Sequence, residues 1–353
     1  MNRYYHAVRQ PVRRPRVEEY LLLTLLSFAL SVSLTRLFLA LTGYPQLGGG
    51  DLHISHVLWG GLFLFIAAML PIIWANRWVY RIGAIFAGVG IGLFIDEVGK
   101  FITQSYDYFF PPAAPIVYAF FLICVLIYLQ FARPGPRRAR SELYAVLEMM
   151  EEILDHDLNT HEQAEIITRL TFVAEQDNNP ELTRLASELL DFFDGDQVYL
   201  APDPPDRLQK LNDQLQDYEA RYLDQRRFRT LLGIGIGGLG LISMLIPILS
   251  LIDIVTSGSD ITPRETSWLI ILQAVQILTG LALIIGSILI FSGRDSTGFR
   301  ISYIILLVYL TILDLFLFYY YQFATIPAAI VQFLLLLGVL YYQQRYPQKR
   351  TVQ

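Results

Sequence analysis

Long apolar runs separated by short polar segments cover most of the chain. Each run holds about 20 residues, which lets an α-helix cross a hydrocarbon core of roughly 30 Å. The pattern predicts an all-α, polytopic integral membrane protein with eight transmembrane helices. The expected spans are Tyr20–Thr42, His53–Trp74, Ile82–Thr103, Pro115–Phe131, Thr230–Val255, Trp268–Phe291, Ile301–Tyr321 and Ile326–Tyr342.

Residues 141–229, between the fourth and fifth runs, have a different pattern. Apolar positions there recur three or four residues apart, which is typical of amphipathic helices. Thr160 is expected to cap the second of these helices, and Asn179 followed by Pro180 to begin the third. The segment therefore predicts a small helical bundle. Its apolar positions are Leu143, Val146, Leu147, Met150, Leu154, Ile167, Leu170, Val173, Leu182, Leu185, Leu189 and Phe193.

A further apolar stripe precedes the fifth span and has two interpretations. It is either a helix that covers the bundle or a coiled coil that joins two copies of the chain into a homodimer. Its positions alternate between three and four residues apart: Leu208, Leu211, Leu215, Tyr218 and Tyr222.

These patterns divide the chain into five parts. Residues 1–19 form a basic cytoplasmic tail and 20–135 a first half of four spans. Residues 136–229 form a cytoplasmic acidic helical domain and 230–343 a second half of four spans. The chain ends in a basic cytoplasmic tail at 344–353.

Composition supports the membrane assignment and narrows the partners. The chain is 54% hydrophobic with a mean hydropathy of +0.43, which excludes a soluble enzyme fold. The net charge is -5, and the acidic residues concentrate between positions 141 and 225, so nucleic acid is not an expected partner. The acidic segment 141–229 favours a cytoplasmic protein partner over anionic lipid. The single cysteine, Cys124, excludes an intramolecular disulfide and a cysteine-based metal site.

Arginine and lysine positions predict the orientation of the spans. Positive charge gathers in alternate loops, whereas the intervening loops hold essentially only Arg264. By the positive-inside rule, both termini and residues 141–229 face the cytoplasm of a prokaryotic plasma (inner) membrane. The first span is expected to be retained, because it is too long for a signal-peptide core. The basic positions are Arg77, Arg81, Arg133, Arg137, Arg138, Arg140, Arg226, Arg227, Arg229, Arg294, Arg300, Arg345, Lys349 and Arg350.

Ionisable side chains inside the first three spans are the candidate functional site. Each charge in hydrocarbon costs roughly 2.5 to 3.5 kcal/mol, so each needs a partner or a purpose. Because neighbouring spans run antiparallel, six of these groups are expected to converge in the outer leaflet. They are Arg36, His53, His56, Asp96, Glu97 and Lys100.

Helical spacing suggests how these charges pair. On a continuous third span, Lys100 lies one turn from Asp96 and offsets its charge. Glu97 points about 100° away and must find Arg36, a histidine or a ligand on another helix. Glu97 is therefore the stronger functional candidate. Gly88 with Gly92 on the third span, and Gly60 with Gly61 on the second, predict close helix contact.

Three functions are compatible with the cluster. The first is an ion- or proton-coupled transport or ligand-binding site, because buried carboxylates beside histidine and lysine suit proton transfer. The second is a metal-dependent hydrolase of a lipid or lipid-linked substrate, with a divalent metal such as zinc held by His53, His56 and Glu97. The third is a structural or interaction protein in which the ion pairs only fix the helix register.

The second half contains a fainter version of the same arrangement. Gln273 and Gln276 open the sixth span three residues apart, as the histidines open the second, and Asp314 lies in the seventh span. A degenerate four-plus-four parallel repeat would explain this spacing, and chance would explain it equally well. Asp314 needs a partner, and the two glutamine amides are the expected donors.

A histidine pair opens one span, and the next glycine-rich span ends in D-E-x-G-K-F, from Asp96 to Phe101. In these residues the chain resembles an uncharacterised family of prokaryotic polytopic membrane proteins. The resemblance extends over Gly48 to Tyr128. It implies a membrane fold and the same polar cluster, but no particular reaction, because the family has no established activity.

Overall fold

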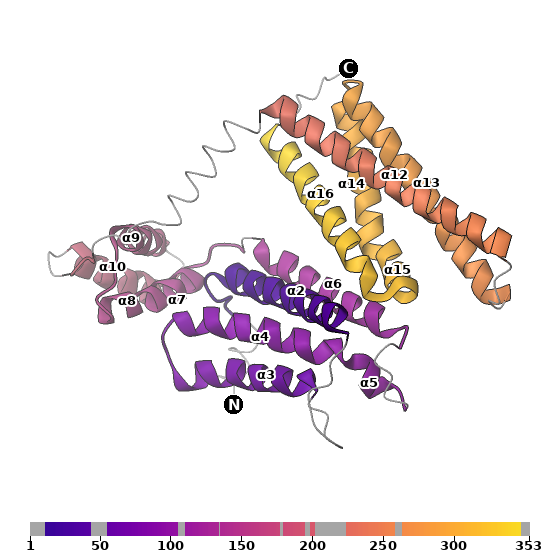
Figure 1. Cartoon of the computed structure of the whole chain (residues 1–353). Helices are drawn as coiled ribbons and strands as arrows, with labels where there is room; N and C mark the ends of the chain where they lie inside the picture. Colours follow the sequence, from indigo (N-terminus) through magenta and orange to yellow (C-terminus); the bar gives the residue numbers. More distant parts are fainter. Residues whose placement is uncertain are drawn as a thin grey trace. The chain divides into compact units, whose positions relative to one another are not determined.

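A computed structural model describes residues 11–43, 55–104, 110–133, 135–176, 179–194, 198–201, 224–257 and 263–346. All regular secondary structure in these ranges is helical (Figure 1). Seven helical stretches in the same ranges are long and apolar enough to cross a membrane. The protein is therefore an all-α polytopic membrane protein, as the apolar pattern predicts.

Contacts divide the chain into two compact units. The first comprises Met1–Asp96 and Ile123–Arg207, and the second comprises Glu97–Leu122 and Leu208–Gln353. This division does not coincide with the expected halves at 20–135 and 230–343. It falls inside helix α6 (Ala113–Ala132), because the first part of α6 packs with helices from the end of the chain.

Three membrane-length helices form the core of the first unit. They are α2 (Val17–Thr42), α3 (His56–Ile73) and α4 (Trp78–Asp96), with α4 between the other two (Figure 1). Gly90 and Gly60 allow the closest approach of α3 and α4. A Cβ atom on Gly90 would lie 2.9 Å from the Gly60 carbonyl oxygen, so both positions must be glycine for the helices to touch.

The predicted roles of the other glycines are partly wrong. Gly88 and Gly92 face α2, where added Cβ atoms would collide with Thr24 and Ser31, and not the second span as expected. A Cβ atom on Gly61 would meet no described atom within 4 Å. The helix that carries Gly88, Gly90 and Gly92 thus has small residues on two faces, because it packs between two neighbours.

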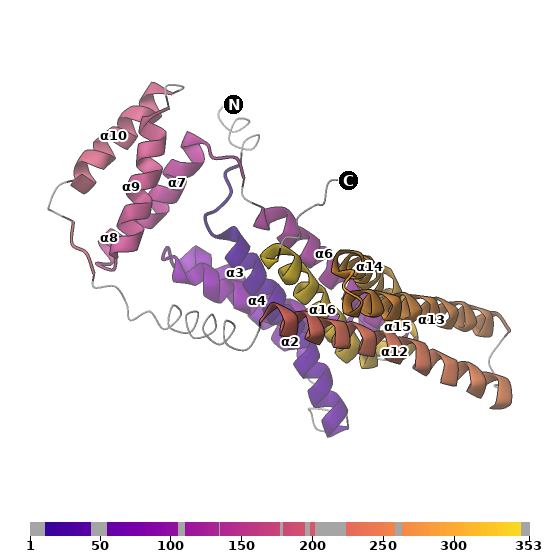
Figure 2. The same cartoon turned by 90° about the horizontal axis from the view of Figure 1, so that it is seen from above.

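The acidic segment folds into the expected small bundle. Its helices are α7 (Ala139–Met149), α8 (Glu151–Leu154), α9 (Thr160–Ala174) and α10 (Pro180–Asp194). Helix α9 packs between α7 and α10 (Figure 2). Its N-cap is Asn159 and not the predicted Thr160, because Asn159 and Glu162 form a reciprocal capping box. Three of the predicted apolar positions, Leu147, Leu154 and Leu185, are exposed and do not join the bundle core. The apolar stripe at residues 208–222 lies outside the described residues.

The second unit holds the remaining long helices. Helices α12 (Gln225–Ser257) and α13 (Pro263–Phe291) form an antiparallel pair. Helix α14 (Asp295–Val308) continues through a π-helix, η1 (Tyr309–Leu313), into α15 (Asp314–Tyr321). A 3-10 turn, η2 (Gln322–Thr325), leads to α16 (Ile326–Arg345).

The last apolar stretch accounts for two of the predicted spans. It runs for 49 residues, from Asp295 to Gln343. A straight helix of that length would measure about 70 Å, more than twice the thickness of a hydrocarbon core. The stretch breaks at Gln322, where φ is 51° and ψ is -142°, and α16 packs back along α14. With this break, the described helices are compatible with the predicted eight spans.

Candidate functional site

The third span does not continue to Thr103 as predicted. Helix α4 ends at Asp96, Glu97 leaves helical geometry with φ -93° and ψ 11°, and a short helix α5 follows at Val98–Ile102. Asp96 and Lys100 therefore do not lie one turn apart on one continuous helix. This one-residue break determines how the buried charges pair.

Asp96 pairs with groups from both neighbouring helices. Arg36 Nε on α2 donates to Asp96 Oδ1 at 2.5 Å, and Arg36 Nη2 donates to the Asp96 carbonyl oxygen at 3.0 Å. His56 Nε2, at the start of α3, lies 3.1 Å from Asp96 Oδ2. The expected meeting of Arg36 and His56 with a carboxylate of the third span is confirmed. We call these three residues the Asp96 cluster.

The predicted pairing of the two carboxylates is reversed. Glu97 Oε1 accepts a bond from Lys100 Nζ at 3.1 Å, three residues along the chain, and Asp96 takes the partners that were expected for Glu97. The cause is the end of α4. Because Glu97 is the turning residue, its side chain and that of Lys100 belong to the short α5 segment, whereas Asp96 keeps its place against α2 and α3.

The three members of the Asp96 cluster differ in how deeply they are buried. Asp96 is 1% exposed and Arg36 5%, whereas the His56 side chain is 22% exposed. Arg36 carries a permanent positive charge that offsets the charge of Asp96. With neutral His56, the net charge of the cluster is zero. Histidine is the side chain whose ordinary titration falls near neutral pH, so His56 is the member that can gain or lose a proton without breaking the ion pair.

The described residues do not assemble the predicted zinc site. The metal hypothesis requires His53, His56 and Glu97, and His53 lies outside the described residues. Glu97 contacts the Lys100 ammonium group, whose charge opposes a bound cation. Among the described residues, no group of three His, Cys, Asp or Glu side chains could hold a metal ion. Zinc binding at His53, His56 and Glu97 stays a prediction.

Gln273 and Asp314, two of the polar residues of the second half, have partners other than the predicted ones. Gln273 Nε2 donates to Ser250 Oγ at 2.7 Å, and none of the described hydrogen bonds joins Gln273 or Gln276 to Asp314. Asp314 lies instead beside Tyr118, whose hydroxyl is 3.4 Å from Asp314 Oδ2. A tyrosine in an apolar run carries no clear sequence signal, so the pattern of the chain could not single out Tyr118.

Polar contacts also join the acidic domain to the membrane helices of the first unit. Arg77 Nη1, in the loop between α3 and α4, donates to Glu152 Oε1 at 2.8 Å. Asn76 donates to Asp155 at 3.1 Å. Burial raises the pKa of Glu152 and the positive charge of Arg77 opposes this increase. Burial, with the nearby charge of Glu148, also raises the pKa of Glu151.

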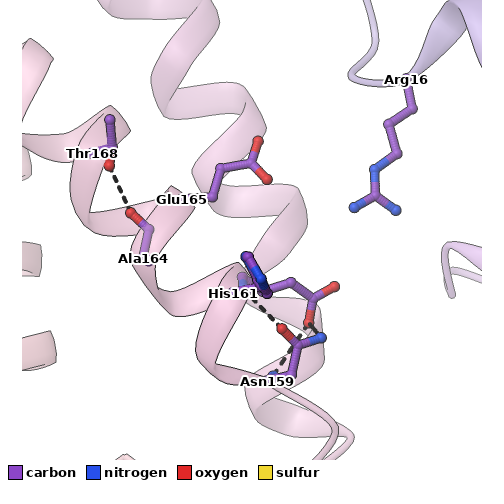
Figure 3. A pocket seen from close by; sticks show the side chains of 7 residues that line it. Arg16, Asn159, His161, Ala164, Glu165 and Thr168 are labelled. Carbon is purple, nitrogen blue, oxygen red and sulfur yellow. Dashed lines mark hydrogen bonds between the residues drawn. The ribbon is translucent and has the colours of Figure 1, made fainter. Parts of the chain in front are cut away.

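A surface depression of about 460 Å³ lies beside this domain, between Arg16 and the first turns of α9 (Figure 3). Three of its polar side chains already have internal partners. Asn159 and Glu162 bond each other in the capping box, and the Thr168 hydroxyl donates to the Ala164 carbonyl. The depression therefore offers few groups for a ligand.

No protein-family model, curated protein or solved structure matches this chain.

Proposed function

We propose that this protein is a plasma-membrane transport protein in which the Asp96 cluster binds a proton or a small ligand. The observation that carries the proposal is the contact of His56 with Asp96 Oδ2, next to the buried Arg36–Asp96 pair. A pair that only fixes the helix register needs one acid and one base. The additional histidine supplies a group that changes charge.

Protonation of His56 changes the charge of the cluster from zero to +1. Within a low-dielectric span, a change of one unit charge alters the energy of the surrounding helices by several kcal/mol. Such a change is large enough to shift the balance between two conformations. Proton binding at His56 therefore gives α2, α3 and α4 a means of responding to a proton gradient.

The arginine and lysine distribution supports the membrane orientation of this proposal. Both termini and residues 141–229 face the cytoplasm of a prokaryotic cell, and the Asp96 cluster lies in the outer leaflet. The acidic domain, anchored through Glu152 and Asp155, offers its outer surface to a cytoplasmic protein partner.

Proteoliposomes loaded with a pH-sensitive dye test the proposal. The purified wild-type protein is expected to move protons down an imposed gradient, and His56→Gln to lose this flux. Glutamine keeps a donor for Asp96, so the variant is expected to melt within a few degrees of the wild type. His161→Gln, in the cytoplasmic domain, is the matched histidine control and is expected to keep the flux.

Two results would contradict the proposal. One is a folded His56→Gln protein with wild-type proton flux. The other is a wild-type protein without flux whose His56→Gln and Asp96→Asn variants lose thermal stability equally, since this is the behaviour of a register-fixing network.

A further inference from the structure

Asp314 is a buried carboxyl group without a cationic partner among the described residues. It is 0% exposed, and its Oδ1 atom has no hydrogen-bond partner in the described part of the chain. None of the described arginine, lysine or histidine side chains forms an ion pair with it. The titratable groups that face it are Tyr118 from α6 and Tyr309 from η1. Asp314 thus lacks what Arg36 provides for Asp96.

The π-helix explains the neighbour that Asp314 does have. In η1 the Asp314 N–H donates to the Tyr309 carbonyl, five residues back, and not to Leu310 as in an α-helix. The Leu310 carbonyl is therefore left for another donor. Tyr118 OH fills this place at 2.7 Å. The π-helix thus leaves a carbonyl oxygen that the Tyr118 hydroxyl binds.

The single hydroxyl proton of Tyr118 can be donated to only one of its two neighbours. Tyr118 has one hydroxyl proton, and the 2.7 Å contact with Leu310 is much the shorter of its two contacts. The second contact, 3.4 Å to Asp314 Oδ2, exceeds the usual length of an O–H···O bond. The Tyr118 oxygen therefore faces Asp314 mainly as an acceptor. A proton on Asp314 would allow the carboxyl group to donate to it.

Gln332 on α16 points to the same conclusion. It is 2% exposed, lies beside Asp314, and its Oε1 atom has no hydrogen-bond partner within the described ranges. Both unsatisfied oxygens, Asp314 Oδ1 and Gln332 Oε1, are acceptors. The Gln332 amide group can donate to Asp314. A neutral amide does not offset the charge of a carboxylate, whereas a carboxylic acid carries no charge and adds a donor.

We propose that Asp314 binds a proton and forms, with Tyr118, a second proton-binding site within the second unit. The group is a neutral carboxylic acid at rest. This site involves other residues than the Asp96 cluster and does not depend on the function proposed for that cluster.

The π-helix also provides a route for release. If η1 returns to α-helical bonding, the Leu310 carbonyl accepts the Asp314 N–H, and the Tyr118 hydroxyl is free to donate to the carboxylate. This bond stabilises the ionised form, so the proton leaves Asp314 for water while Tyr118 keeps its own. A local helix change is thereby linked to proton binding.

Infrared spectroscopy of the purified full-length protein tests the proposal. At neutral pH the wild type is expected to show the carbonyl band of a protonated carboxylic acid, and Asp314→Asn to lack one such band. The band is expected to shift in D₂O, since the proton exchanges. Asp295→Asn is the matched control and is expected to leave the band unchanged, because Asp295 lies outside both sites and pairs with Arg229.

Tyr118→Phe is a second variant that keeps Asp314. It removes the donor needed for release, so the acid band is expected at a shifted frequency and to persist to a higher pH than in the wild type. This variant gives an answer even if Asp314→Asn does not fold.

Each contrary result would overturn the proposal. If neither Asp314→Asn nor Tyr118→Phe changed the carbonyl bands of protonated carboxylic acids, Asp314 would be ionised. A band that never shifts in D₂O would show a sealed structural acid. Loss of the band on addition of Na⁺ at constant pH would show a metal-ion site in place of a proton site.

Discussion

Asp96 and Asp314 are both buried aspartates in apolar helices, and both lie at an irregularity of the helix. Asp96 is the last residue of α4, and Asp314 follows η1. Their neighbours differ. Asp96 has Arg36 and His56 on its two carboxylate oxygens. Asp314 has the Gln332 side chain and the Tyr118 hydroxyl, which bonds mainly to the Leu310 carbonyl.

This difference shows that burial alone does not decide the charge of an acid. Asp96 has the permanent positive charge of Arg36 beside it, whereas Asp314 has no cationic partner among the described residues. The same substitution, aspartate to asparagine, should therefore have opposite consequences at the two positions. Asparagine closely resembles a protonated aspartate but cannot replace an ionised one.

Asp96→Asn should give the largest loss of stability. It leaves Arg36 buried without a counter-charge, and arginine cannot lose its proton. Removal of one partner of a buried pair costs about 3 to 5 kcal/mol. Thermal melts in detergent should show a strongly lowered melting temperature, with Asp314→Asn close to the wild type as the matched control. Equal losses in the two variants would end the distinction between the two acids.

Arg36→Leu should give a smaller loss. The abandoned Asp96 can take up a proton, so the remaining cost is that of a neutral polar group with fewer bonds, about 1 to 3 kcal/mol. The double variant Arg36→Leu with Asp96→Asn should be no less stable than Asp96→Asn alone. Melting temperatures of the three proteins provide the measurement, and an Arg36→Leu protein less stable than Asp96→Asn would contradict this order.

Glu97→Gln should have a weaker effect on stability and leave proton flux unchanged. Its partner Lys100 is 23% exposed in its side chain, so the ammonium group can move toward water when the carboxylate is removed. We expect a loss of about 1 kcal/mol, since a glutamine still accepts a hydrogen bond. A loss of flux with the fold intact would restore Glu97 as the functional carboxylate.

Glu151→Gln should produce the smallest change, and the change should depend on pH. Burial and the charge of Glu148 raise the pKa of Glu151 above 4.5 in the folded protein. The folded protein therefore binds a proton at Glu151 more tightly than the unfolded chain does. The stability that this proton provides is lost as the pH rises through the pKa of Glu151 in the folded protein. Glutamine never ionises, so the variant should melt higher than the wild type near neutral pH and equally near pH 4. A difference in melting temperature that grows toward acidic pH would contradict the raised pKa of Glu151.

The pattern of apolar residues was sufficient to predict the helices. Hydrophobic length determines which segments enter a bilayer, and this property is local to each segment. The acidic bundle followed from helical spacing in the same way. The meeting of Arg36 and His56 with one carboxylate of the third span also followed, because antiparallel neighbours of similar length bring residues near the same end together.

The pairing of individual charges depended on tertiary structure. Two side chains four residues apart usually lie on the same face of a helix. The break in the helix at Glu97 separates the side chains of Asp96 and Lys100 despite this spacing. Glu97 is therefore left with Lys100, and Asp96 with Arg36.

In the second unit, the environment of Asp314 arises from η1 and from Tyr118, which lies 196 positions earlier in the chain. Neither has a signal in the local sequence. A π-helix changes a hydrogen-bond register by one residue, and a distant side chain becomes a neighbour only through packing. The sequence by itself determined where the helices and the buried acids lie, and the tertiary structure decided which acid meets a positive charge.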